Sequence, residues 1–302
     1  MSKSRHSLPA GTRIDCYRIR KLIGRGGFSL IYLADDEDTG AEVVIKEFMP
    51  KKLARRDSHL RVEPQKSRMT ANLNRSLRLF FQEVKVLAAL RHPNVVEIQG
   101  VVRENGTAYI VMTYYRGKNL AYYIKKHGGG LSSRFLLRVF VPLLEALDMI
   151  HRRGYLHLDI KPSNIHLRAG QEPVLLDFGA VHQMNAHRGR HGGQVVTAGY
   201  SPVEQYYKGG FIGPWSDIYA VGASLRACID GRTPPTSIEH HAEDKFRPAV
   251  EIHAHRYPRF LLELIDWCME LDPLNRPQNA GELLNHLRAR TGRPLPAVET
   301  DP

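Results

Sequence analysis

Cysteine is scarce in this sequence: only Cys16, Cys228 and Cys268 occur among 302 residues. The three are far apart, odd in number and set among apolar neighbours such as Ile229 and Trp267. A disulfide framework or a cysteine-based metal site needs more cysteines at closer spacing. We therefore expect structural thiols in a reducing compartment.

Long hydrophobic runs are also missing. No apolar stretch approaches the roughly 18 to 20 residues needed to cross a bilayer, and no signal-peptide-like segment follows Met1. We expect no membrane segment within this chain, and a cytoplasmic location is the default expectation. Residues 292–302 have linker composition, so the alternative of a fragment with a membrane anchor beyond Pro302 stays open.

Charge is the one strong compositional bias, because the net charge is +12. Much of it is local, between Lys51 and Arg68. Neither zinc-finger spacing nor a series of stacking aromatics accompanies this basic stretch. A solvated basic insertion is therefore favoured, and a nucleic-acid partner is not expected.

Alternating apolar residues, separated by glycine-rich turns, mark the first part of the chain. The pattern predicts three antiparallel strands between residues 17 and 46, a helix over residues 72–90, and strands at 95–102 and 108–114. The turn Glu104-Asn105-Gly106 joins the last two strands as a hairpin. The expected first lobe is a five-stranded antiparallel sheet with one main helix.

The pattern changes at the polar residues 116–119, and beyond them it is mostly helical. The predicted helices cover residues 120–126, 133–153, 215–228, 260–269 and 280–290. The expected fold class is α+β. We expect a flexible N-terminal arm (1–14), a first lobe (15–115) with an insertion at about 48–72, a helical second lobe (116–291), and a proline-rich tail or linker (292–302).

A glycine cluster, Gly24, Gly26 and Gly27, lies between two strands rather than ahead of a helix. This position argues against a dinucleotide fold and against a P-loop, and it favours a flexible hairpin whose amides close over a polyphosphate. Lys46 ends the next strand, so its stem lies on a buried sheet face while its amine needs a counter-charge. Glu83 on the following helix is the predicted partner. A merely structural ion pair is the alternative, but the place behind a glycine loop favours function.

The segment His157-Leu-Asp159-Ile-Lys161-Pro-Ser-Asn164 puts a carboxylate, an amine and a carboxamide close together. Its proline keeps it from becoming regular helix. A second acidic residue, Asp177, follows the apolar run 174–176. Two short loops that each bear a carboxylate predict a site for metal and phosphate.

These motifs, in this order, resemble the signature of the protein kinase family over residues 17–290. The order is a glycine loop, the lysine of Val-Val-Ile-Lys, a helix glutamate, His-x-Asp-x-x-x-x-Asn, and Asp-Phe-Gly. Each motif is common alone, but the series is specific. The sequence is most similar to bacterial eukaryotic-like Ser/Thr kinases, in a subgroup with a long insertion before the helix and no arginine before the catalytic aspartate. The resemblance implies the bilobal protein kinase-like fold.

The resemblance also implies catalytic roles. Lys46 would hold the α- and β-phosphates of ATP, and Glu83 would fix Lys46. Asp159 would accept or orient the proton of the attacking hydroxyl. Lys161 would neutralise charge on the transferred phosphoryl group.

The cofactors implied by the resemblance are ATP and Mg²⁺, with Mn²⁺ as an alternative ion. Asn164 and Asp177 are the implied metal ligands, because Mg²⁺ favours oxygen donors. The implied nucleotide-binding residues are Gly24, Gly26, Gly27, Ser29, Ile31, Val44, Lys46, Met112, Thr113, Tyr115, Asn119, Asn164 and Asp177.

Two residues indicate the acceptor class. Ser/Thr kinases carry a lysine at the position of Lys161, and Thr197 resembles the threonine that bonds to the catalytic aspartate and lysine in that class. Asp217 resembles the aspartate that braces the catalytic loop, and Glu204 with Arg276 resembles the ion pair that anchors the activation segment. The expected activity is transfer of the γ-phosphoryl group of ATP to Ser or Thr of protein substrates.

One departure from the family pattern concerns control. Leu158 replaces the arginine that, in kinases that have it, is held by a phosphate on the activation loop. Residues 180–196 contain no Ser, Thr or Tyr. The loop therefore has no residue that could accept a phosphate, and the arginine that would bind one is also missing. We expect activity without phosphorylation of this loop.

The second departure is the insertion at about 48–72, which lengthens the connection between Lys46 and Glu83. One interpretation is a decorative surface loop. The other is that the insertion sets the helix position through contact with a regulatory partner or another copy of the chain.

Two other functions are compatible with parts of this pattern. A pseudokinase, or ATP-binding interaction module, is the main alternative, and it is disfavoured because all five polar groups of the signature are present. A small-molecule phosphotransferase of the same fold is disfavoured by the matches at residues 197–204 and at Asp217.

Overall fold

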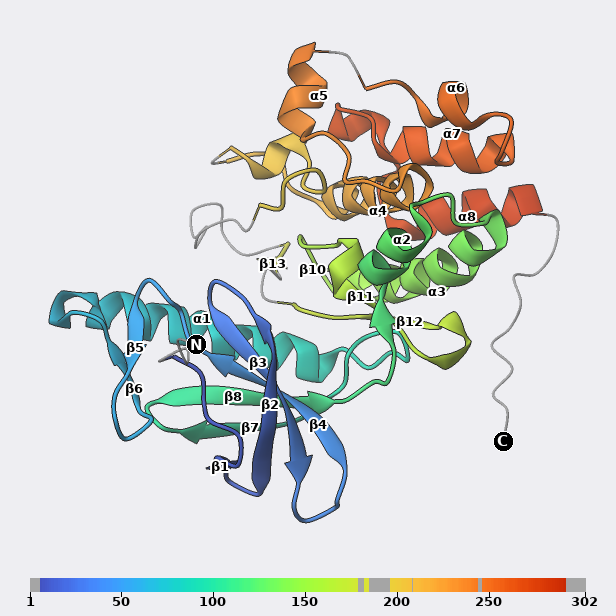
Figure 1. The fold of residues 1–302 in the computed structure, drawn as a ribbon. Helices are drawn as coiled ribbons and strands as arrows, with labels where there is room; N and C mark the ends of the chain where they lie inside the picture. The colour runs from blue at the N-terminus through green and yellow to red at the C-terminus, as the bar shows by residue number, and fades with distance from the viewer. Residues whose placement is uncertain (1–5, 179–181, 185–195, 208, 244–245, 292–302) are drawn as a thin grey trace. The chain divides into compact units, whose positions relative to one another are not determined.

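The computed structural model describes residues 6–178, 182–184, 196–207, 209–243 and 246–291. The chain forms two compact units (Figure 1). Unit 1 contains Met1–Arg91 and Val96–Tyr115, and unit 2 contains His92–Val95 and Arg116–Pro302. The predicted tail at 292–302 lies outside the described residues. Within the described part, no helix combines the length and apolar character that a bilayer crossing requires.

Unit 1 is built on an antiparallel sheet of six strands in the order β1-β2-β3-β4-β8-β7. The five predicted strands are all present, and the short β1 adds a sixth at the edge. The strands are β1 (Arg13–Ile14), β2 (Tyr17–Arg25), β3 (Ser29–Asp36), β4 (Glu42–Phe48), β7 (Ile98–Glu104) and β8 (Thr107–Thr113). Their alternation of apolar residues gives the sheet one face that packs into the core.

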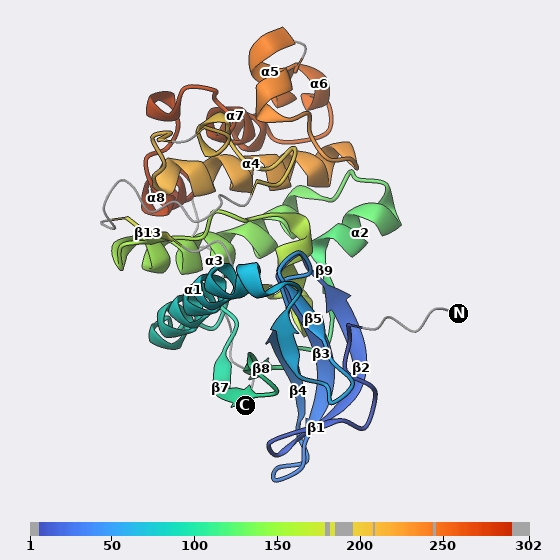
Figure 2. The same cartoon turned by 90° about the vertical axis from the view of Figure 1, so that its left-hand side faces the viewer.

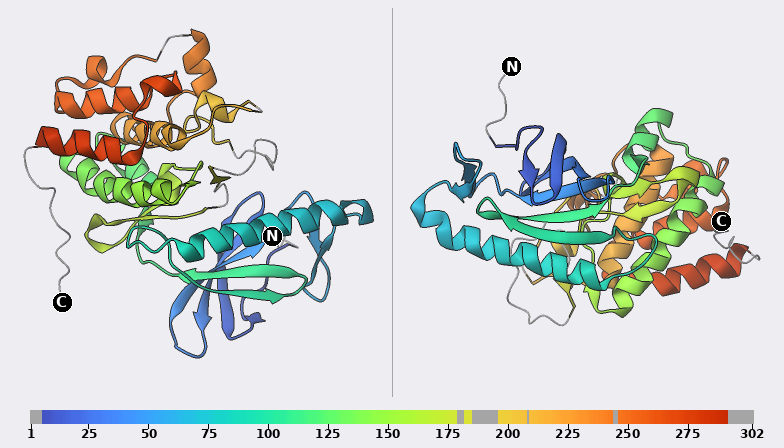
Figure 3. Two further views of the ribbon diagram at one scale, coloured as in Figure 1. Left: turned by 180° about the vertical axis from the view of Figure 1, so that it is seen from behind. Right: turned by 90° about the horizontal axis from the view of Figure 1, so that it is seen from below.

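The predicted helix of unit 1 is α1 (Thr70–Ala89), which follows the short 3-10 helix η1 (Ser67–Met69). It runs alongside β7 and β8 (Figure 3). Leu73, Phe80 and Val84 are spaced at helical period and are buried together in the core of unit 1. Phe80 also packs on Phe48, with ring centroids 5.4 Å apart.

The insertion of unit 1 forms a separate two-stranded hairpin of β5 (Ala54–Arg56) and β6 (Val62–Pro64) (Figure 1). Ala54 and Val62 are buried in the core. The backbone N–H of Val62 donates to the carbonyl of Asn105, in the β7–β8 turn, at 2.7 Å. The insertion is therefore packed onto unit 1 rather than surrounded only by solvent.

Unit 2 is mostly helical, and the five predicted helices are present. The short α5 and α6 were not predicted. The helices are α2 (Leu120–His127), α3 (Ser133–Arg152), α4 (Pro214–Asp230), α5 (Ser237–Glu243), α6 (Ala249–His253), α7 (Arg259–Cys268) and α8 (Ala280–Thr291). The central helix α4 lies between α3 and α7 (Figure 2) and is buried along most of its length. The predicted fold class, α+β, is confirmed.

Short strands position the loops of unit 2. A three-stranded sheet joins β9 (Lys118–Asn119), β11 (Ile165–Leu167) and β12 (Pro173–Leu175), and β10 (Tyr155–Leu156) pairs with β13 (His182–Gln183). The 3-10 helix η2 (Pro162–Asn164) precedes β11, and η3 (Ala169–Gln171) connects β11 to β12. The segments predicted to carry chemistry lie at the ends of these strands.

Candidate active site

One face of the unit 1 sheet gathers several predicted nucleotide-binding residues. Lys46 pairs with Ile31 across β3 and β4, and Val44 pairs with Met112 across β4 and β8. Directly opposed residues of antiparallel strands point to the same face, and so do residues two apart on one strand. Gly24 joins the same row because it pairs with Ile31. Ile31, Val44 and Met112 are half-buried, while Lys46 is buried.

The predicted glycine loop connects β2 and β3. The N–H of Gly26 donates to the carbonyl of Ser29 at 2.8 Å, which closes a tight turn. The start of the insertion holds this loop from the other side, because Met49 N–H donates to Phe28 O at 2.8 Å and Lys51 N–H donates to Gly27 O at 3.2 Å. The loop is thus bound to the chain segment that follows β4.

For the remaining predicted residues of unit 1, the structure shows fewer contacts that bear on nucleotide binding. Glu83 lies within α1, but its side chain is outside the described residues, so its pairing with Lys46 stays a prediction. Thr113 ends β8 and donates its hydroxyl to Glu97 Oε2 at 3.0 Å. Tyr115 is the last residue of unit 1.

In unit 2, three predicted side chains contact the Asp159 carboxylate. Lys161 Nζ lies 2.8 Å from both carboxylate oxygens, and the Thr197 hydroxyl donates to Oδ1 at 2.7 Å. Asn164 Nδ2 donates to Oδ2 at 3.0 Å and to the Asp159 carbonyl at 2.9 Å. Lys161 Nζ also donates to Thr197 Oγ1 at 3.2 Å. The carboxylate is therefore held in one orientation. Asp159 is only 8% exposed.

The β11–β12 hairpin brings Asn164 and Asp177 to the same end of the hairpin, one just before β11 and the other two residues after β12. Ile165 pairs with Leu175, and Leu176 N–H donates to the Asn164 carbonyl at 2.8 Å. Asp177 is exposed and has φ of 57°, in the left-handed region that a non-glycine residue rarely adopts. Asn119, also a predicted nucleotide-binding residue, accepts from the N–H of Tyr122 at 3.0 Å and so caps α2.

The backbone of the loop at residues 157–164 is braced by Asp217 of α4. Its Oδ1 accepts from the N–H of Leu158 at 2.7 Å, and its Oδ2 accepts from the N–H of His157 at 2.9 Å. His151 Nε2 lies 2.9 Å from the same Oδ2. Burial alone would raise the pKa of Asp217, but the contact with His151, the nearby imidazoles and the His157 N–H together lower it. Asp217 is thus an ionised acceptor inside the unit.

A protein-family model described as "Protein kinase domain" matches residues 17–287. The chain belongs to the protein kinase family. The match covers the glycine loop and Lys46 in unit 1, and Asp159, Asp177 and Asp217 in unit 2, which confirms the family inferred from the order of motifs.

This kinase domain is similar to named bacterial kinases. It is 34% identical to the probable serine/threonine-protein kinase PknB of Bifidobacterium longum over 93% of this chain and 40% of that protein. It is 31% identical to the serine/threonine-protein kinase PrkC of Bacillus subtilis over 72% of this chain and 31% of that protein. The chain spans less than half the length of these curated relatives.

A solved structure supports the fold. The apo form of PpkA-294 superposes with a TM-score of 0.82 and 35% sequence identity, covering 93% of this chain and 99% of that one. The resemblance to bacterial Ser/Thr protein kinases and the kinase-like fold are therefore confirmed.

The predicted ion pair of the kinase domain between Glu204 and Arg276 is present. Arg276 Nη1 and Nη2 donate to the two carboxylate oxygens at 2.7 and 3.2 Å. The guanidinium also donates to the carbonyls of Glu270 and Leu271 at 2.6 and 2.9 Å. A fully buried arginine needs this many partners, because each unpaired N–H in the interior is costly.

Two residues of the kinase domain that support the loop at residues 157–164 were not predicted from the sequence. His151 contacts Asp217, and Gln205 Nε2 donates to the Leu158 carbonyl at 3.0 Å. Neither belongs to a motif. For His151, the sequence offered one signal, a polar residue on the otherwise apolar face of the helix predicted at 133–153. For Gln205 it offered none.

His157 of the kinase domain begins the loop at residues 157–164 and contacts the loop that carries Asp177. Its ring packs on Phe178 with centroids 4.7 Å apart, and its Nε2 lies 3.2 Å from the Leu176 carbonyl. Its Nδ1 accepts from the N–H of Asp159 at 3.2 Å. Burial lowers the pKa of His157, which favours the neutral ring with Nε2 as donor and Nδ1 as acceptor.

Proposed function

We propose that this chain is an ATP-dependent protein kinase that transfers the γ-phosphoryl group of ATP to Ser or Thr hydroxyls of protein substrates. The observation that carries the proposal is the Asp159 carboxylate, held by Lys161, Thr197 and Asn164. Phosphoryl transfer depends mainly on positioning and charge neutralisation, and these four side chains supply both.

Lys46 and the sheet face around it are proposed to bind the nucleotide. The half-buried side chains of Ile31, Val44 and Met112 offer an apolar surface to a flat base, and the Lys46 amine offers positive charge to phosphate. The family match at these positions supports this assignment.

Asn164 and Asp177 are proposed to hold Mg²⁺. The donor chemistry fits, because a carboxylate and a carboxamide oxygen are the hard ligands that Mg²⁺ prefers. Asn164 uses its Nδ2 to donate to Asp159, so its Oδ1 is the atom left for a cation. When bound, the ion would neutralise phosphate charge. Mn²⁺ would suit the same oxygen donors.

Asp159 is proposed to orient the substrate hydroxyl and to accept its proton. Its carboxylate already accepts from Thr197 and Asn164, so it cannot rotate away from a substrate without breaking these bonds. Lys161 is proposed to move part of its interaction from Asp159 to the transferred phosphoryl group. The Lys161–Thr197 contact at 3.2 Å supports a Ser/Thr acceptor.

We also propose that activity does not require phosphorylation of residues 180–196, a segment that lies almost entirely outside the described residues. Two observations support this. The Thr197 hydroxyl donates to Asp159, and Leu158 is held by Asp217 and Gln205, so neither contact involves a phosphate-binding arginine. Mass spectrometry of active protein should find Thr197 unmodified, and a requirement for its phosphorylation would contradict the proposal.

The insertion is proposed to convey contact with a regulatory partner or a second copy to the nucleotide-binding residues. It hydrogen-bonds the glycine loop through Met49 and Lys51. Charge reversal at the exposed Lys52 and Arg55 should change activity or oligomeric state, as measured by light scattering and kinetics, without loss of thermal stability. Unchanged values in both assays would favour a purely structural insertion.

The decisive experiment compares the parent chain with Asp159→Ala in the presence of labelled ATP and Mg²⁺. We expect label on a generic protein substrate or on the chain itself with the parent only. ATP binding by both proteins without transfer would instead support the pseudokinase alternative.

A further inference from the structure

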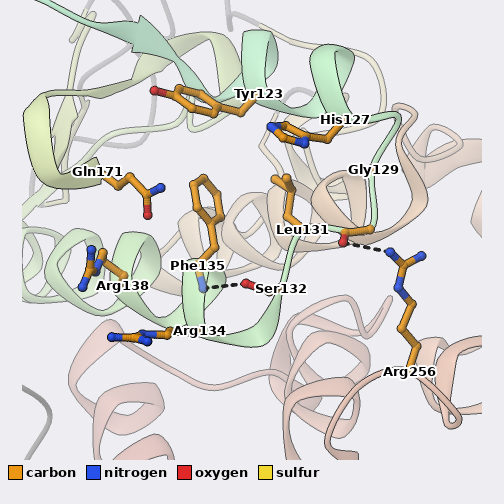
Figure 4. A pocket seen from close by; sticks show the side chains of 11 residues that line it. Tyr123, His127, Gly129, Leu131, Ser132, Arg134, Phe135, Arg138, Gln171 and Arg256 are labelled. Carbon is orange, nitrogen blue, oxygen red and sulfur yellow. Dashed lines mark hydrogen bonds between the residues drawn. The ribbon is translucent and has the colours of Figure 1, made fainter.

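Unit 2 contains a cavity of about 550 Å³ that the proposed catalysis does not use (Figure 4). It lies between α2, the start of α3, η3 and the residues that follow α6. Tyr123, Leu131 and Phe135 give it an apolar centre. Four basic side chains lie around it, and no carboxylate of the described residues lines it. The basic residues are His127, Arg134, Arg138 and Arg256.

The positions of Arg134 and Arg138 oppose helix stability. Both are exposed in the first turns of α3, where the helix end carries partial positive charge and the first turn has no acidic residue. They are also four residues apart, a spacing at which like charges repel. Elsewhere in unit 2 the same spacing joins arginines to acids, in the pairs Arg152–Asp148, Arg168–Glu172, Arg226–Asp230, Arg247–Glu251 and Arg259–Glu263.

Arg256 is built into the opposite side of the cavity from Arg138 (Figure 4). Its Nη2 donates to the Gly130 carbonyl at 3.0 Å. A Cβ on Gly130 would lie 2.1 Å from this nitrogen, so the glycine leaves room for the guanidinium. Arg138 Nη1 similarly lies 3.4 Å from the Gly170 carbonyl. Carbonyl partners orient the two guanidinium groups, and Arg256 also lies over the Tyr257 ring at 5.8 Å, but these contacts supply no carboxylate.

We propose that this cavity binds an acidic peptide segment that carries one apolar side chain. Guanidinium groups recognise carboxylates through paired hydrogen bonds, and the centre formed by Tyr123, Leu131 and Phe135 can bury the apolar side chain. The basic groups lie on different sides of the cavity, so one small anion cannot contact them all. A peptide with several carboxylates can.

The segment is proposed to belong to protein substrates, and this part of the inference rests on the proposed kinase function. A docked segment raises the effective concentration of a Ser or Thr elsewhere in the same substrate. Docking should therefore lower KM for the substrate and leave kcat unchanged, because the cavity residues are separate from Asp159 and Lys161.

The binding test uses a fluorescein-labelled peptide of about ten Glu and Asp residues with a central Phe, followed by fluorescence anisotropy at low salt. We expect at least tenfold weaker binding to the variant Arg134→Glu/Arg138→Glu. A peptide with Gln and Asn in place of the acids should bind at least tenfold more weakly to the parent. The charge-matched control, Arg288→Glu/Arg290→Glu on α8, should bind like the parent.

Three results would overturn the inference. They are equal binding by the parent and the cavity variant, equal loss in the α8 control, and displacement of the peptide by inorganic phosphate at concentrations similar to those of the peptide. Misfolding is not expected to interfere, because both positions are exposed and a glutamate at position 134 suits the helix end. The melting temperature of Arg134→Glu/Arg138→Glu should stay close to that of the parent, because the repulsion between two like charges is kept. Arg134→Gln/Arg138→Gln serves as a second variant.

The kinetic test uses a short Thr acceptor peptide, alone or joined to the acidic segment by flexible linkers of about 5, 10 and 20 residues. At least one linker should lower KM fivefold or more, and Arg134→Glu/Arg138→Glu should abolish this gain without changing turnover of the short peptide. A gain that persists in the variant would contradict substrate docking. Peptide binding without any phosphoryl transfer by the parent would contradict the proposed function and leave the binding inference standing.

Discussion

Arg56 of the insertion and Glu47 of β4 form a buried ion pair, with Arg56 Nη2 donating to both carboxylate oxygens at 2.7 and 2.6 Å. The two side chains are 2% and 0% exposed. Tyr32 donates its hydroxyl to Glu47 Oε2 at 2.8 Å, and Arg56 Nη1 donates to the Leu60 carbonyl at 2.7 Å. Burial alone would lower the pKa of Arg56, but the Glu47 carboxylate raises it, so the guanidinium stays charged. Because Glu47 follows Lys46 directly, this pair ties the insertion to the strand that bears the proposed catalytic lysine.

Replacing Arg56 by Met should destabilise the chain strongly, because it leaves the buried Glu47 carboxylate without its partner. We expect a loss of about 3–5 kcal/mol in the free energy of unfolding. Urea denaturation followed by circular dichroism measures it. Arg55→Met is the matched control on the same strand; its pair with Glu63 is exposed, so the loss should stay below about 1 kcal/mol.

A double-mutant cycle separates the pair from other effects of Arg56. The variant Glu47→Gln/Arg56→Met should lose less than the sum of the two single variants, because no unpaired charge remains. Additive losses would show that the two groups contribute independently.

Removing the Thr197 hydroxyl should lower kcat, because Asp159 Oδ1 then loses a donor at 2.7 Å. We expect Thr197→Val to reduce kcat by about tenfold or more, and Thr197→Ser to retain most activity since it keeps the hydroxyl. Initial rates at saturating ATP measure this. Equal activity of Val and Ser variants would mean that the hydroxyl does not orient Asp159.

Asp217→Ala should reduce both stability and turnover, because it leaves the buried N–H groups of His157 and Leu158 without an acceptor. At about 1–3 kcal/mol for each of the two unpaired groups, the free energy of unfolding should fall by about 2–6 kcal/mol. Urea denaturation and kcat are the measurements. Glu251→Ala, which breaks an exposed ion pair on α6, should change neither value appreciably.

His157 should make the chain less stable below neutral pH. Its pKa in the folded chain is lowered from the ordinary 6.5, so its stabilising contribution is complete above pH 6.5. As pH falls through the lowered folded value, this contribution is lost, because the unfolded chain binds the proton first. The loss is bounded by about 1.4 kcal/mol per pH unit.

Unfolding free energies at pH 7.5 and 5.5 test this effect of His157. The difference between the two pH values should shrink in His157→Phe, even though the variant is less stable at both. The control His59→Phe, at an exposed position, should keep the parent's difference. An unchanged pH dependence in His157→Phe would show that another group is responsible.

Local patterns were sufficient to predict much of the fold. The strands of unit 1 and the longer helices of unit 2 follow from apolar periods of two and 3.6 residues, which act over neighbouring positions. The short strands β5 and β6 and the helices α5 and α6 contain too few residues for a period to appear. They form because the surrounding core buries groups such as Ala54 and Ala249.

The sequence by itself determined the family and the fold class, because the motif order and the apolar periods are local features. It also determined which residues surround Asp159, because Lys161 and Asn164 belong to the same short loop. Tertiary structure decided which distant charges meet. Nothing local to Arg56 indicates Glu47 as its partner, and nothing local to His151 indicates Asp217. The cavity between Arg138 and Arg256 likewise exists only once α3 and the chain after α6 are packed in one unit. Such contacts depend on long-range packing. The energy of that packing is shared among many residues and cannot be inferred from any one segment.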